Sequence, residues 1–123
     1  MPYTYTVEGP RRLVRIRIDT RLLPDDISAM VQELSTDPRI TPDFVQLIDC
    51  SALSSVEELR TERVRSRAAG PLSRVARRAF VAPQPAVYGL CRMFASYFEM
   101  ANRPEPVGVF RTMREAEEWL GLH

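Results

Sequence analysis

Hydrophobic and polar residues alternate in two stretches near the N-terminus. Residues 3–7 place Tyr3, Tyr5 and Val7 on one face of an extended chain and threonines on the other. Residues 13–18 alternate aliphatic side chains with two arginines. A period of two, with aromatic and β-branched residues, is typical of strands. Because a turn sequence with glycine and proline separates the stretches, we predict a β-hairpin with one solvent-facing side.

Apolar residues recur at helical spacing in four longer stretches. Between residues 23 and 38 they follow the i, i+3, i+4, i+7 pattern of an amphipathic helix, at Ile27, Met30, Val31 and Leu34. Similar patterns, end signals and capping residues predict further helices over 54–71, 85–101 and 112–122. Short apolar runs predict three more strands, at 44–49, 77–82 and 107–110.

The predicted order of elements is ββαβαβαβα, in which strands alternate with helices after the hairpin. Such an order is typical of an α/β fold with a mainly parallel sheet and helical crossovers. We therefore expect one domain over residues 1–123, with a mixed sheet of four to five strands.

Composition and charge narrow the class of protein. The 123 residues are 45% hydrophobic and 27% charged, and the net charge is +1, so the overall charge predicts no polyanionic partner. No apolar run approaches the roughly 20 residues of a membrane span, and the N-terminus lacks the apolar core of a signal peptide. We expect a cytoplasmic protein. In a reducing compartment, the two cysteines, Cys50 and Cys91, are expected to be free and buried.

The predicted helix over 85–101 carries unusual residues on the side opposite its apolar stripe. This side holds Gly89, Arg92, Met93 and Met100, and Tyr88 lies beside it. Since glycine costs about 1 kcal/mol against alanine in a helix, Gly89 needs a reason. Either another element packs closely there, or a ligand approaches the first turn. Met93 and Met100 suit either packing within the chain or contact with a partner.

Three stretches resemble a known family. The sequences FVQLIDCSALSSVEEL, RRAFVAPQPAVYGLCRMF and VGVFRTMREAEEWLGL are similar to SpoIIAA-like, STAS-type bacterial proteins, whose architecture is related to the SEC14/CRAL-TRIO lipid-binding fold. The resemblance covers nearly the whole chain. It implies a four- or five-stranded mixed sheet with helices, and most relatives of this size have no assigned biochemical role.

The resemblance also draws attention to Ser54 and Ser55. STAS-type anti-sigma antagonists carry a phosphorylatable serine at a strand–helix junction, in a motif like Asp-Ser-Ser-Gly, which this chain lacks. Ser54 and Ser55 are nearest in place. Ser55 and Glu58 have the spacing of a capping box, so we predict that Ser55 is a helix N-cap and that neither serine is phosphorylated.

The residues predict no enzyme. The only histidine is His123, and lysine is absent, which excludes a lysine Schiff base and a P-loop. The acidic pairs lie in predicted first turns or on solvent-facing helix sides, so we expect neither a metal site nor a cofactor. Asp49, at the carboxyl end of a central strand, is the best-placed carboxylate. It could contact a ligand or cap nearby backbone N–H groups.

Arginines are concentrated in residues 60–78, and three of them, Arg60, Arg63 and Arg67, share one helix side. The segment could be a solvated face, a surface for an acidic protein or anionic ligand, or a nucleic-acid surface. Because it has no aromatic residue for stacking, we expect no specific nucleic-acid binding. We expect the whole segment to lie at the surface.

Two functional hypotheses remain open. The first is a non-enzymatic STAS-like regulatory or protein-interaction module, whose partner is a second copy or an unknown protein. The second is a small-molecule or lipid-binding module with a pocket between the sheet and the helix that begins at residue 85. A pocket of roughly 300 Å³ or more would favour the second. A patch at Met93 and Met100 that is buried between chains would favour the first.

Overall fold

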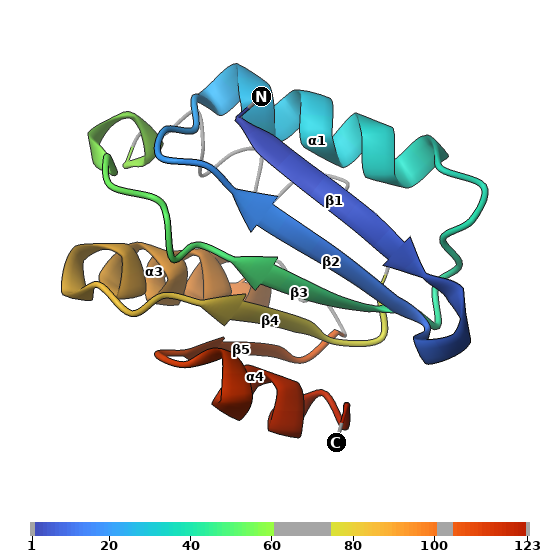
Figure 1. Ribbon diagram of the computed structural model, residues 1–123. Helices are drawn as coiled ribbons and strands as arrows, with labels where there is room; N and C mark the ends of the chain where they lie inside the picture. Colours follow the sequence, from blue (N-terminus) through green and yellow to red (C-terminus); the bar gives the residue numbers. More distant parts are fainter. Residues whose placement is uncertain (1, 61–74, 101–104, 123) are drawn as a thin grey trace.

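The computed structural model describes residues 2–60, 75–100 and 105–122 of the chain. Five strands form one sheet in the order β1-β2-β3-β4-β5 (Figure 1). The first pair is antiparallel, and every later pair is parallel. The predicted α/β class with a mixed sheet is therefore confirmed. The strands are β1 (Tyr3–Glu8), β2 (Leu13–Ile18), β3 (Val45–Asp49), β4 (Arg78–Val81) and β5 (Val107–Phe110).

The helices lie on both sides of the sheet. Figure 1 shows α4 in front of the sheet and α1 and α3 behind it. Short 3-10 helices follow β1 and β3. The bounds are η1 (Gly9–Arg11), α1 (Pro24–Thr36), η2 (Glu57–Leu59), α3 (Pro85–Met100) and α4 (Met113–Trp119). Of the helix predicted over 54–71, only the beginning falls within the described residues, and there the chain forms η2.

The alternation along the strands separates two apolar cores. On the first face, Tyr3, Val14, Ile16 and Ile18 belong to a core with the apolar sides of α1 and α3. On the second face, a smaller core joins the strands to α4 and consists of Leu13, Leu47, Ala79, Val81, Ala116 and Leu120. Because side chains alternate across a strand, the period of two decides which of the two faces each strand residue occupies.

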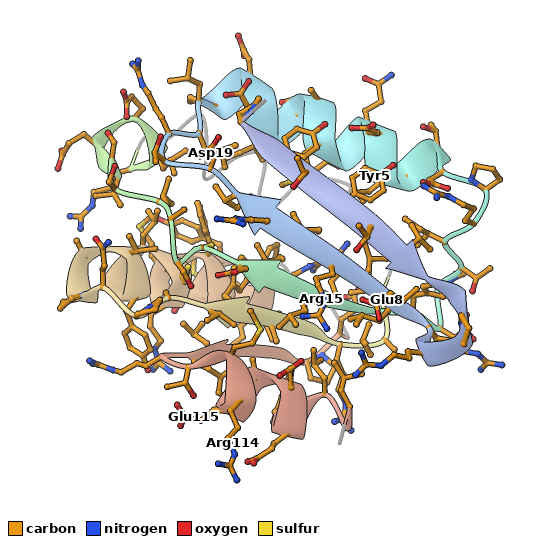
Figure 2. All side chains as sticks on the ribbon, viewed as in Figure 1. Tyr5, Glu8, Arg15, Asp19, Arg114 and Glu115 are labelled. Atoms are coloured by element: carbon orange, nitrogen blue, oxygen red, sulfur yellow. The ribbon has the colours of Figure 1, made fainter. Side chains whose placement is uncertain are left out.

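The second face of the sheet is covered only in part. Within the described residues, α4 packs mainly against β3, β4 and β5. Over β1 and β2 this face instead carries ion pairs, in which the Arg15 guanidinium contacts Glu8 at 3.1 Å and Glu117 at 3.5 Å. Figure 2 shows Glu8 and Arg15 side by side on this face, and Arg114 on the outer side of α4. The predicted solvent-facing side of the hairpin is confirmed here, since Thr4, Thr6 and Arg17 are exposed.

A close contact fixes α4 against β5. The Phe110 ring lies over Gly108, so that a Cβ on Gly108 would be 2.6 Å from a ring carbon. The ring centroids of Phe110 and Trp119 are 5.5 Å apart and their planes are tilted by 48°. The N-terminus of α4 is capped as predicted, because the backbone N–H of Glu115 donates to the Thr112 hydroxyl at 3.2 Å.

Candidate functional site: the outer side of α3

The helix α3 has one buried side and one exposed side, as its sequence pattern predicts. Val87, Leu90, Cys91 and Phe98 are buried against the sheet. The opposite side carries the exposed residues Gly89, Arg92, Ser96 and Met100 together with half-buried Met93, and half-buried Tyr88 lies beside it. We call these six residues the α3 outer surface.

Gly89 faces open space within the described part of the chain. A Cβ at this position would meet no atom of the described residues within 4 Å, apart from its chain neighbours and the backbone of its own helix. Among the described residues, no other element packs closely against Gly89, so this part of the chain gives no support to the packing explanation. The absence of a side chain leaves a gap in the outer side of the first turns of α3, where a partner could approach the backbone closely.

Tyr88 stacks with an arginine that the sequence reasoning missed. The Arg111 guanidinium carbon lies 4.6 Å from the centroid of the Tyr88 ring, a cation–π contact. Arg111 directly follows β5, and Tyr88 is in the helix that follows β4. Because these strands are parallel neighbours, both residues lie near the same carboxyl edge of the sheet. The pair extends the α3 outer surface toward this edge.

The two methionines of the α3 outer surface differ in burial. Met93 packs against the main core, which agrees with packing within the chain. Met100 is 68% exposed. In the described ranges, Leu23 is the other exposed large hydrophobic residue, and its exposed fraction is 38%. An apolar side chain with this exposure suits contact with another molecule, and methionine adapts to irregular partners.

Asp49 fixes the loop that follows β3. Its carboxylate accepts hydrogen bonds from the backbone N–H of Ser51 at 3.0 Å and from the Ser51 hydroxyl at 2.5 Å. This is the capping arrangement, one of the two roles considered for this residue. Within the described ranges, His, Cys, Asp and Glu side chains form no group of three suited to a metal ion.

The two serines beside this loop also make structural hydrogen bonds. Ser54 donates to the Thr20 carbonyl through its backbone N–H at 3.0 Å and its hydroxyl at 3.2 Å. The Ser55 hydroxyl donates to the Glu58 carboxylate at 2.9 Å. This bond, together with an ion pair to Arg21, holds the pKa of Glu58 below its ordinary value. The predicted N-cap role of Ser55 is wrong, because η2 begins after Val56 and has no side-chain cap.

The arginine-rich segment is not wholly at the surface. Arg60 and Arg77 are exposed, whereas Arg63 and Arg67 lie outside the described residues. Arg78 is only 4% exposed, which contradicts the expectation for the segment. Its Nε donates to Gln46 at 2.9 Å, and its guanidinium lies 5.0 Å from the centroid of the Phe98 ring. As the first residue of β4, Arg78 lies on the same face of the sheet as Phe80, the face that packs against α1 and α3.

A small apolar cavity lies between the sheet, α1 and α3. Its volume is about 110 Å³. Within the described part of the chain, its lining is almost entirely apolar and includes Ile16, Leu34, Phe94 and Phe98 from three different elements, with Gln46 and Arg78 as polar exceptions. The volume is well below the roughly 300 Å³ of a typical ligand pocket.

Cys50 and Cys91 line the same cavity. Both are free and buried, as predicted. The hydrogen bond to Cys91, together with burial, raises the pKa of the Cys50 thiol well above its ordinary value. Since the thiolate is the reactive form, the Cys50 thiol is suited to packing and not to nucleophilic chemistry.

Comparison of the chain with protein-family models, with curated proteins and with solved structures gives no match. The resemblance to STAS-type proteins therefore stays a prediction. Among the helices within the described ranges, none combines the length and the apolar character that crossing a membrane requires.

Proposed function

We propose that the chain is a non-enzymatic, STAS-like regulatory module that acts by binding another protein through the α3 outer surface. The proposal places it in the bacterial cytoplasm. Free Cys50 and Cys91 support a reducing compartment, where thiols remain unpaired.

The observation that carries the proposal is the 68% exposure of Met100 at the end of the α3 outer surface. Gly89, beside which the described residues leave open space, lies on the same helix side. Arg92, exposed between them, supplies a charge for the rim of an interface. Interfaces commonly combine methionine, tyrosine and arginine in this way.

The polar groups at the carboxyl edge of the sheet favour binding over catalysis. This edge is where α/β proteins usually hold ligands and reacting groups. Here the Asp49 carboxylate accepts two hydrogen bonds from Ser51, and Ser54 donates twice to the Thr20 carbonyl. These groups stabilise the loops in the positions where an enzyme would hold its nucleophile or base.

Site-specific photo-crosslinking in the cells that produce the chain tests the proposal. A photoreactive residue would replace Ser96, in the middle of the α3 outer surface, or exposed Gln32 on α1 as a matched control. We expect a discrete protein adduct from position 96 and none from position 32. Met100→Asp should reduce the adduct at position 96. Equal labelling from both positions, or none from position 96, would count against the proposed surface.

The second candidate function is binding of a small apolar molecule in the cavity between the sheet and α3. The 110 Å³ volume admits only a small molecule, since an engineered apolar cavity of about 150 Å³ holds benzene. Leu34→Phe would fill space in this cavity. If a host-derived apolar ligand co-purifies with the wild-type chain and is lost from this variant, the second function gains support.

A further inference from the structure

The outer edge of β1 is open to another strand. In the sheet order, β1 is terminal and pairs only with β2. Within the described ranges, no strand lies on its other side. A six-residue edge strand presents a row of backbone donors and acceptors that can pair with a further strand.

The hydrogen-bond register shows which backbone groups point outward. The N–H of Asp19 donates to the Pro2 carbonyl at 2.8 Å, so this pair bonds across the hairpin. Hydrogen-bonded and non-bonded pairs alternate along antiparallel strands. The backbone groups of Thr4, Thr6 and Glu8 therefore point toward β2. Those of Tyr3, Tyr5 and Val7 point away from the sheet.

Three common protections of an edge strand are missing from β1. Natural edge strands commonly carry proline, lysine or a bulge that prevents pairing. The sequence YTYTVE has none of these, and its one charge is Glu8 at the end. The register with β2 runs without interruption over all six residues.

Contacts with α1 hold the strand in a fixed conformation. The Tyr3 hydroxyl donates to the Glu33 carboxylate, and the Tyr5 hydroxyl donates to Asp37 at 2.9 Å. Figure 2 shows Tyr5 between β1 and α1. A strand that is already ordered loses little conformational entropy when it pairs, so the edge is preorganised for association.

We propose that β1 pairs in an antiparallel arrangement with β1 of a second copy of this chain, about a two-fold axis at Tyr5. In this register Tyr5 lies opposite Tyr5 of the second copy, and Tyr3 lies opposite Val7. The outward groups of these three residues form six backbone hydrogen bonds, and the two five-stranded sheets become one. This surface is separate from the α3 outer surface and does not depend on the function proposed for it.

The side chains of β1 are complementary to themselves in this register. On the open face Thr4 lies opposite Thr6 of the second copy, and such threonine pairs are favourable in sheets. On the other face Tyr5 meets Tyr5 of the second copy, and Tyr3 meets Val7, and both kinds of pair are favourable in sheets. Glu8 lies opposite Pro2, so no like charges meet. If the second β1 strand were shifted by two residues, only two of the three outward-pointing residues would lie opposite a residue of that strand.

Charge substitution at the exposed threonines tests the proposal on the full chain. Thr4 and Thr6 are exposed, so Thr4→Lys/Thr6→Lys and Thr4→Glu/Thr6→Glu should both leave the monomer folded. In a dimer each double variant places two like-charge pairs across the interface. We expect a wild-type dimer in sedimentation velocity and at least about tenfold weaker association for each variant. An equimolar mixture of the two variants should recover the dimer, because opposite charges then meet.

Hydrogen exchange tests whether backbone hydrogen bonds of β1 form the dimer contact. The outward amides of Tyr5 and Val7 should be protected in the wild-type dimer and exchange rapidly in either variant, whereas the inward Thr6 amide position stays protected. Met100→Asp is the matched control and should leave dimerisation unchanged. A monomeric wild-type chain at micromolar concentration would overturn the proposal. So would a dimer that both charge variants retain, since it would use another surface.

Discussion

Replacing Gly108 by alanine would place a methyl group in space that the Phe110 ring occupies. The added Cβ would lie 2.6 and 2.7 Å from two ring carbons and 3.4 Å from a carbon of Trp119. Carbon atoms prefer separations of about 3.5–4.0 Å, so the Phe110 ring must move by about 1 Å. It cannot move freely, because Trp119 packs against it with the centroids 5.5 Å apart.

The expected cost of this substitution follows from overpacking. Crowding of this kind typically costs about 1–3 kcal/mol. Without the clash, alanine would be favoured over glycine in a strand by roughly 0.5–1 kcal/mol. Because alanine would otherwise stabilise the strand, a net destabilisation by Gly108→Ala reports the clash between the added methyl group and the Phe110 ring. At this chain length it corresponds to a melting temperature lower by roughly 3–5 °C for each kcal/mol.

Thermal and denaturant unfolding of matched glycine variants provide the assay. Gly89→Ala is the control, because in the part of the chain that the structure describes its Cβ, on a helix, meets nothing within 4 Å. It should stabilise the chain by up to about 1 kcal/mol. In a Phe110→Ala background, the penalty of Gly108→Ala should disappear. An unchanged or higher melting temperature for Gly108→Ala in the wild-type background would refute the packing described between β5 and α4.

Three further predictions concern titration and capping. Because the pKa of the Cys50 thiol is raised, Cys50 in the native chain should react slowly with a disulfide reagent at pH 8, and fast labelling would contradict this. The stabilisation from the neutral thiol should be lost as the pH rises above about 8.5, the pKa of a cysteine in the unfolded chain. Burial and the hydrogen bond to Glu33 raise the pKa of Tyr3 to about 12, so its phenolate absorbance should appear only near that pH and be missing in Tyr3→Phe. Thr112→Ala should cost about 1 kcal/mol as a lost N-cap, and Ser55→Ala should cost less in the same unfolding assay, because Ser55 caps no helix.

Periodicity predicted most of the fold. The strict alternation in 3–7 and 13–18 fixed both strands of the hairpin, since one buried face specifies the register. The same physical rule placed the apolar stripe of α3 correctly, and it identified the side that carries Met100. The bounds of β2 and β5 agree with the predictions, whereas the other strands and the helices differ at one end or both, because end positions depend on local hydrogen bonds.

Burial of charge and local capping could not be predicted from periodicity. Arg78 is buried because β4 begins at that residue and Gln46 pairs with it across the neighbouring strand, a long-range register that sequence spacing does not show. Ser55 has correct capping-box spacing, yet its hydroxyl donates a hydrogen bond to the Glu58 carboxylate and caps no backbone N–H. Arg111 contacts Tyr88 only because β4 and β5 are neighbours.

The open edge of β1 could be predicted from the sequence only in part. The hairpin was predicted, but its place at the end of the sheet was not, because strand order depends on the crossovers. Once the sheet order is known, the lack of proline and lysine in YTYTVE becomes informative.

Native mass spectrometry of the chain, purified gently from the cells that produce it, tests most directly whether it is a protein-interaction module. It reports bound protein and bound small molecules in the same measurement. The account predicts assemblies that contain a second copy or another protein, with no retained small molecule in the cavity. Single chains that carry an apolar small molecule, and no protein assembly, would contradict the account and favour the ligand-binding function.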